Sequence, residues 1–208
     1  FEVSKLEEAT AKRYLPAAKL SKLKSSTASN PQCEYARKLF LFSYYCYGIS
    51  FIDMAMLTAA HIKQMEDGDY IVYKRQKIKR QKGVKPISIK ITLDPELIGS
   101  LQAASPTVDD FLLPIVTRSG YTGERLYMHI RTRYSKYQKY LRLLAEELGI
   151  DFHLTSYVSR HTAAMTLQRN NIPREVISQM LGHADLETTN IYLDSFDNRV
   201  INEAAKVL

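Results

Sequence analysis

Apolar side chains recur at helical spacing over long parts of the chain. Over residues 34–47 they return every three or four positions until Gly48, which predicts a core helix that ends at this glycine. A longer helix is predicted within residues 123–148, where Gly149 provides the stop signal. The apolar face of that helix carries Tyr137, Tyr140, Leu141, Leu144 and Leu148. These two segments indicate a mainly helical domain.

Several shorter helices are predicted from capping residues and local periodicity. Asp53 is expected to cap a helix over residues 54–62, and Asp94 to cap one that has Pro95 in its first turn. The remaining helices are expected at roughly 155–170, at 173–181 with Pro173 in the first turn, at 185–193 with Asp185 as the cap, and at 195–207.

One stretch has a different pattern. In "YIVYKRQKIKRQKGVKPISIKITL", residues 70–93, β-branched side chains gather at both ends around a basic middle that contains Gly83. This pattern is typical of an antiparallel hairpin of two or three short strands. The predicted fold class is therefore mainly α with a small antiparallel β-hairpin or sheet.

The chain divides into a short lead-in and one domain. Residues 1–30 mix charged with small polar side chains, which predicts a short amphipathic piece and a flexible linker. Residues 31–208 form the main domain, which ends in the helix at 195–207. Because the chain begins with Phe1 rather than methionine, we expect a further part upstream.

Composition adds an expected partner. Lys and Arg number 29 against 22 Asp and Glu, a formal net charge of +7, which favours a polyanion such as nucleic acid or an anionic membrane surface. The longest uncharged stretch, residues 39–52, is too short for a spanning helix of about 20 residues. Cys33 and Cys46 lie in no metal-binding pattern, so we expect free thiols, no metal and a cytoplasmic location.

Two segments carry candidate chemistry. Residues 74–85 hold seven cations and no carboxylate, which is either a solvated hairpin tip or a phosphate-binding surface. Strand alternation would place three of them on one face, at Arg75, Lys77 and Lys79. In "SYVSRHTAA", Arg160 has apolar neighbours on both sides of the helix, so it needs either a structural carboxylate or a phosphate. His161 would point elsewhere and is interpreted as structural.

The end of the chain adds a histidine and a tyrosine. His183 follows Leu-Gly at a predicted helix end, where capping or core roles are common, and Tyr192 is one of 14 tyrosines, most of which must pack. Their order is more specific than either residue. A basic hairpin, Arg160, "LGH" at 181–183 and a tyrosine nine residues later resemble the catalytic domain of tyrosine recombinases, the phage-integrase family. The resemblance extends from about Asn30 onward and is most specific in "MLGHADLETTNIYL".

The resemblance implies a reaction and a set of roles. In this family a tyrosine attacks a DNA phosphodiester and forms a 3′-phosphotyrosyl bond, without a metal or another cofactor. By motif, the catalytic residues would be Tyr192 as nucleophile, Arg160 as the second active-site arginine, His183, and Lys77 as general acid. DNA would be contacted by Arg75, Lys79, Arg80 and Lys82. It also implies that residues 1–30 are a lead-in from a missing N-terminal DNA-binding domain. The implied partner is double-stranded DNA, and the implied protein is bacterial or phage-type and nucleoid-associated, without a membrane partner.

Two positions depart from the family pattern. "LFLFSYYCYGISFIDMAML" resembles the first conserved box, but Tyr47 occupies the place of its arginine, and Tyr157 replaces a histidine three residues before Arg160. Losing one such preorganised donor typically costs about 10²–10³ in rate. Arg75 or Arg80 are candidates to replace the lost cation.

Three functions therefore remain open at this point. The first is a recombinase that integrates, excises or inverts DNA, and the second is a cleavage-deficient relative that only binds DNA. The third is a basic helical domain that binds RNA or protein. The helix at 195–207 is expected to dock either on a neighbouring subunit, within a tetramer on DNA, or on its own domain.

Overall fold

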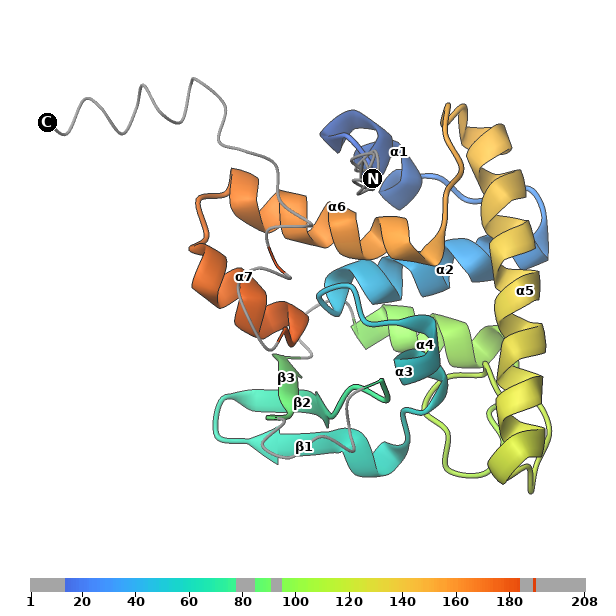
Figure 1. Cartoon of the computed structure of the whole chain (residues 1–208). Coiled ribbons are helices and arrows are strands. Elements are labelled where there is room, and N and C mark those ends of the chain that lie inside the picture. Colours follow the sequence, from blue (N-terminus) through green and yellow to red (C-terminus); the bar gives the residue numbers. More distant parts are fainter. Residues whose placement is uncertain (1–13, 78–84, 91–94, 184–188, 190–208) are drawn as a thin grey trace, which may run out of the picture.

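The computed structural model describes residues 14–77, 85–90, 95–183 and 189 of the 208-residue chain (Figure 1). The helices are α1 (Ala17–Ser25), α2 (Pro31–Tyr45), α3 (Phe51–Ala55), the 3₁₀ helix η1 (Ala59–His61), α4 (Pro95–Ala104), α5 (Gly123–Leu148), α6 (Ser156–Arg169) and α7 (Arg174–Leu181). The strands are β1 (Ile62–Met65), β2 (Gly68–Tyr73) and β3 (Ile87–Lys90). The predicted fold class, mainly helical with a small antiparallel sheet, is confirmed.

Helix α2 forms the centre of the fold, as its periodicity predicted. The Asn30 side chain caps it by accepting from the backbone N–H of Gln32 at 2.8 Å, and Pro31 occupies its first turn. Its buried face, which includes Leu39 and Phe40, contacts α4, α5 and α6. Figure 1 shows α6 above α2 and α5 running along one side of both.

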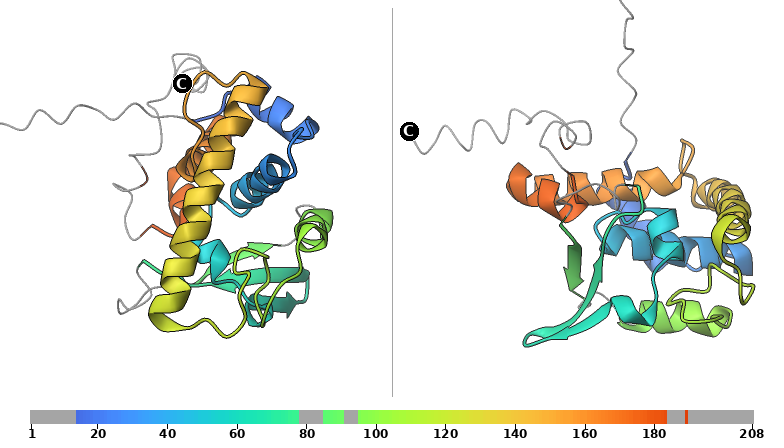
Figure 2. Two further views of the ribbon diagram at one scale, coloured as in Figure 1. Left: turned by 90° about the vertical axis from the view of Figure 1, so that its right-hand side faces the viewer. Right: turned by 60° about the horizontal axis from the view of Figure 1, so that its bottom comes forward.

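The long helix predicted between residues 123 and 148 is also present. Gly149 ends α5 in the left-handed conformation, with φ of 62°, which glycine adopts without a steric cost. Tyr137, Leu141 and Leu144 are buried against the core, while the opposite face is charged. Figure 2 shows α5 extending along the molecule from the level of the sheet to that of α1.

The sheet has three antiparallel strands in the order β1-β2-β3. Ile71 pairs with Ile62 on one side and with Ile89 on the other, and Tyr73 pairs with Ile87. The side chains that face the core alternate along the strands, as expected for a sheet with one buried face. The hairpin predicted over residues 70–93 contains most of β2 and all of β3, whereas β1 was missed and its first residue was assigned to the helix over 54–62.

The prediction around Asp53 is wrong. Ser50 is the N-cap of α3, its hydroxyl accepting from the Asp53 backbone N–H at 3.2 Å, so Asp53 lies inside the helix rather than before it. The helix also ends at Ala55 instead of continuing to Ile62, which already belongs to β1. Pairing with β2 gives residues 62–65 the backbone partners that a helix would have supplied.

The last described helices, α6 and α7, match the predictions closely, except that Pro173 is the N-cap of α7. The predicted helix at 185–193, apart from Thr189, the predicted helix at 195–207 and the Asp94 cap lie outside the described residues. Within the predicted lead-in, Leu15, Leu20 and Leu23 are buried in the same core as α2, while the boundary at residue 31 stays a prediction. None of the helices in the described ranges has the length and apolarity needed to cross a bilayer.

Candidate active site

Arg160 is the centre of the candidate site. It projects from α6 and is only 4% exposed. Its Nη1 donates to the Gly48 carbonyl at 3.1 Å, and its Nη2 donates to the Leu181 carbonyl at 2.5 Å. The guanidinium therefore connects the turn after α2 with the end of α7, two segments that are far apart in the sequence.

Gly48 allows this arrangement because it has no side chain. A Cβ atom at this position would lie 2.4 Å from the Arg160 Cα atom, which is closer than real Cβ contacts come. The residue also has a φ of 71°, and the preceding Tyr47 has a φ of 57°, which is unusual outside glycine. Below this turn, the hydroxyls of Ser43 and Ser159 lie 2.7 Å apart and join α2 to α6. The turn is thus shaped to receive Arg160.

His183 stands next to Arg160. Gly182 ends α7 with a φ of 64°, and the following imidazole places Nε2 at 2.7 Å from Arg160 Nη2. Arginine can only donate, so Nε2 is the acceptor. Nδ1 then carries the ring proton and donates it to the hydroxyl of the buried Thr189 at 2.7 Å. The histidine is neutral in this arrangement and held at both ring nitrogens.

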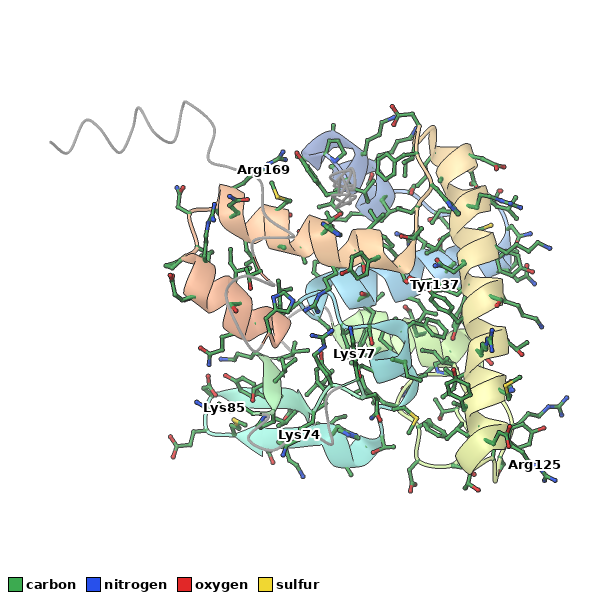
Figure 3. All side chains as sticks on the ribbon, viewed as in Figure 1. Lys74, Lys77, Lys85, Arg125, Tyr137 and Arg169 are labelled. Carbon is green, nitrogen blue, oxygen red and sulfur yellow. The ribbon has the colours of Figure 1, made fainter. Side chains whose placement is uncertain are left out.

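The loop after β2 carries two of the predicted cations and places one of them beside the end of α7. Arg75 Nη1 donates to the Gly182 carbonyl at 3.3 Å, and Lys77 is exposed on the following turn (Figure 3). The prediction that Arg75, Lys77 and Lys79 alternate on a strand face is wrong for the first two, because β2 ends at Tyr73. Lys79 lies outside the described residues, as do Arg80 and Lys82.

A buried carboxylate holds this loop. Asp53 Oδ1 accepts from the Gln76 backbone N–H at 2.7 Å, between Arg75 and Lys77, and its Oδ2 accepts from the Ser50 hydroxyl at 2.6 Å. Asp53 is 4% exposed. It therefore connects α3 with the loop that carries both cations. Sequence reasoning missed this role, although the Ser50-x-x-Asp53 spacing is a recognisable capping signal.

A cleft of about 430 Å³ opens beside Arg160, between α3, α5 and the start of α6. Three arginines contribute to its lining, Arg75, Arg131 and Arg160, together with the rings of Tyr127, Tyr134 and Tyr157. The part played by α5 was not predicted. Its signal in the sequence is the spacing of Tyr127, Arg131 and Tyr134, which places all three on one helix face.

The two substituted positions have different surroundings. Tyr157 is 53% exposed at the cleft and makes an edge contact with the buried His161, at 5.0 Å between ring centroids. Tyr47 is half-buried and packs against the core, and it is not among the residues that line the cleft. Burial and the nearby Cys46 raise the pKa of the Tyr47 phenol, while a hydrogen bond from the Lys90 backbone opposes this change. Tyr192 lies outside the described residues.

The described residues offer little for a bound metal. Among them, no group of three or more His, Cys, Asp or Glu side chains is placed to hold an ion. Cys33 and Cys46 are both buried free thiols, as predicted, and burial raises the pKa of Cys46 to about 12.

Comparison with known proteins gives consistent matches. The model of the phage integrase family matches residues 14–199. The tyrosine recombinase XerD of Brucella abortus biovar 1 (strain 9-941) is 29% identical over 128 residues, which cover 58% of this chain and 38% of that protein. XerD of Halalkalibacterium halodurans is 43% identical over 54 residues, 26% of this chain and 18% of that protein.

Solved structures show the same fold. The crystal structure of XerA recombinase aligns with a TM-score of 0.63 and 22% identity, covering 93% of this chain and 64% of that one. XerH recombinase bound to its difH substrate aligns with a TM-score of 0.63 and 19% identity, covering 92% of this chain and 53% of that one. This chain thus spans less than two thirds of the length of each relative.

Proposed function

The chain belongs to the phage integrase family, and from that premise we propose that it is a site-specific DNA recombinase that cuts and rejoins duplex DNA through a 3′-phosphotyrosyl intermediate. The observation that carries this proposal is Arg160, which lines the cleft and has His183 Nε2 at 2.7 Å from its Nη2. A guanidinium held in place by backbone carbonyls offers a phosphodiester a preorganised cation, and the imidazole beside it offers a proton acceptor. Integration, excision and inversion of a mobile element all use this reaction.

The proposed roles follow from the chemistry of each group. The Tyr192 phenol attacks phosphorus, and the bond from phosphorus to the 5′ oxygen breaks. Lys77 donates a proton to that leaving oxygen, and Arg160 stabilises the charge on the non-bridging oxygens. His183 Nε2 is the candidate to take up the phenolic proton, once its lone pair is released from the contact with Arg160 Nη2. The new phosphotyrosyl bond keeps the energy of the phosphodiester, so that another 5′-hydroxyl can reseal the strand.

We further propose that Arg75 supplies the cation that Tyr47 cannot. Arg75 lines the same cleft as Arg160, and its contact with the Gly182 carbonyl holds it beside the "LGH" segment. Tyr47 is neutral and packs toward Lys90 and the core. Tyr157 stands at the cleft with an exposed ring, where its hydroxyl can hydrogen-bond a phosphate oxygen as a histidine would.

Tyr47 also supports the second candidate, a cleavage-deficient relative that binds DNA. A nicked duplex that traps the cleaved strand, assayed on a denaturing gel, separates the two. The duplex site is first selected by binding from a pool of random sequences. A recombinase gives a covalent protein–DNA band that is absent in Tyr192→Phe and weakened in Arg160→Ala.

The role of Arg75 has its own test in the same assay. Arg75→Ala is expected to slow formation of the band by about 10²-fold, the effect of removing one preorganised donor. Lys74→Ala is the matched control, because Lys74 is an exposed cation of the same loop. Selective DNA binding without any band would instead favour the cleavage-deficient relative, and Tyr47→Arg restoring the band would identify the missing arginine as the cause.

Further parts of the proposal concern DNA binding and assembly. Lys79, Arg80 and Lys82 would neutralise phosphates, so the affinity for DNA should fall steeply with salt. Assembly as a tetramer on DNA through residues 195–207 and a nucleoid location are proposed on the family's pattern. Size measurement on DNA, with and without these residues, tests the assembly.

A further inference from the structure

The cleft beside Arg160 has an interior that phosphate binding alone does not require. Its volume is about 430 Å³, within the range of small-molecule pockets, and its lining is mostly apolar. A phosphate needs donors and cations, which Arg75, Arg131 and Arg160 provide. The apolar remainder of the cleft therefore has room for a second chemical group next to the phosphate.

Exposed aromatic rings form much of this remainder. Six large apolar side chains are exposed among the described residues, and three of them, Tyr127, Tyr134 and Tyr157, line this one cleft. Tyr127 is 58% exposed and Tyr157 is 53% exposed. Flat rings left open beside cations are the combination that proteins use to stack nucleobases.

One of these rings is held in place before any ligand arrives. The Tyr134 hydroxyl lies 2.7 Å from Gln138 Nε2 and 3.2 Å from the Ser156 hydroxyl, so α5 and the first turn of α6 both fix it. Its ring also contacts Phe51, at 5.3 Å between centroids. A ring fixed in this way offers a stacking surface with little entropy to lose on binding.

Building on the proposed recombinase function, we infer that this cleft takes up one nucleobase, unstacked from the duplex beside the phosphodiester that Arg160 holds. A nucleobase is flat, neutral and aromatic, and it is covalently joined to a phosphodiester. It is thus the component of DNA that matches an apolar aromatic cleft with arginines on its wall. The unstacked base gains a stacking contact in return for the pair that it loses.

A double-mutant cycle between the protein and the DNA tests this inference. Affinity is measured in the Tyr192→Phe background, so that no covalent product forms, for the selected duplex and for duplexes that lack one base at each nucleotide flanking the cut. The protein variants are Tyr127→Ala, Tyr127→Phe and Met128→Ala. Met128 is the neighbour of Tyr127 on α5, is similarly exposed, and does not line the cleft.

At one flanking position, Tyr127→Ala should weaken binding of the intact duplex by about ten-fold and leave binding of the abasic duplex unchanged. Tyr127→Phe keeps the ring and should behave like the parent protein, and Met128→Ala should show no coupling at any position. An equal effect of Tyr127→Ala on intact and abasic duplexes at every flanking position would overturn the inference.

The covalent-band assay keeps the two proposals apart. A band together with no coupling overturns the nucleobase site and leaves the recombinase intact. Coupling without a band supports the nucleobase site and overturns the proposal that the protein cleaves DNA. If there is no band and no coupling, both proposals are overturned.

Discussion

The two halves of the candidate site are built differently. In the half formed by α6 and the end of α7, Arg160 is buried and joined to Gly48, Leu181 and His183. In the other half, the described part of the loop after β2 carries Arg75 and the exposed Lys77, and Asp53 anchors it between them. The half proposed to bind the phosphate is thus buried, whereas the half proposed to supply the proton depends on a few contacts. Changes in the first half should therefore affect folding and catalysis together, and changes in the second mainly catalysis.

The largest effect is expected from Arg160→Ala. Loss of the guanidinium should slow formation of the covalent intermediate by about 10²–10³-fold, because one set of preorganised donors is lost. It should also lower the melting temperature, since two buried carbonyls lose their partner. A single-turnover assay on the nicked duplex and a thermal melt measure the two effects. Full stability with full activity would show that this half is not a joint structural and catalytic unit.

Gly48→Ala should disrupt the same half of the site without removing a charged group. The added methyl would collide with the Arg160 backbone, so we expect the free energy of unfolding to fall by about 2–4 kcal/mol. We also expect Arg160 to be displaced, which should slow cleavage. Gly149→Ala is the matched control, because Gly149 also has positive φ but has nothing within 4 Å of the added atom. It should cost only about 1–2 kcal/mol and spare cleavage. Chemical denaturation measures both, and equal losses would argue against the collision.

Asp53→Asn probes the other half. Weaker hydrogen bonds to Gln76 and Ser50 should misplace the loop and slow cleavage roughly ten-fold, with a smaller loss of stability than Gly48→Ala causes. If the carboxylate acts through Lys77, a substrate with sulfur in place of the bridging 5′ oxygen should restore most of the rate, since a thiolate leaves without a proton. Asp109→Asn is the control, an exposed carboxylate with comparable partners, Ser119 and Gly120. Failure of the sulfur substrate to rescue would separate Asp53 from proton transfer.

The smallest effect should come from a charge outside both halves. Burial raises the pKa of Glu34, but hydrogen bonds from Arg37 and from the Ala28 backbone outweigh it, and the net pKa is lowered. A lowered pKa stabilises the folded state above the unfolded-state value near 4.3, and this contribution is lost as the pH falls through the folded-state pKa. Between pH 7 and pH 3 the free energy of unfolding, measured by chemical denaturation, should fall by about 1 kcal/mol less in Glu34→Gln than in the parent protein. If the stability of both proteins fell equally with pH, Glu34 would not be a cause of the loss of stability in acid.

The sequence was most informative where a pattern depends on neighbouring residues. Helices α2 and α5 were predicted because periodicity and a terminal glycine are local signals. Strand β1 was missed because "IKQM" has no strong strand preference and depends on pairing with β2. The extent of α3 was wrong for the same reason, since pairing with β2 also decides the conformation of the residues beyond this helix.

In the candidate site, too, residues in local motifs could be predicted, whereas contacts that depend on tertiary packing could not. Arg160, His183 and Lys77 could be named from the order of motifs, and their roles stay predictions. That Arg160 contacts the Gly48 carbonyl, 112 positions away, depends on how α2 packs against α6. Arg131 and the tyrosines of α5 were missed as site residues because each looks like an ordinary helical side chain until the cleft brings them together. Asp53 was missed because its contact with the Gln76 backbone, 23 positions away, depends on tertiary packing.

Gly182 has a consequence for how the family's "LGH" segment can diverge. It ends α7 with positive φ, and an added Cβ would lie 2.3 Å from the Ile87 Cδ1 atom of β3. The Ile87 atom is the end of a flexible side chain and can turn away, whereas the left-handed backbone of Gly182 strains any larger residue whatever the space. In evolutionary terms the glycine is therefore retained first by the way α7 ends and only second by its neighbour in β3. Related chains with a larger residue at 182 should end this helix differently, whichever residue stands at 87.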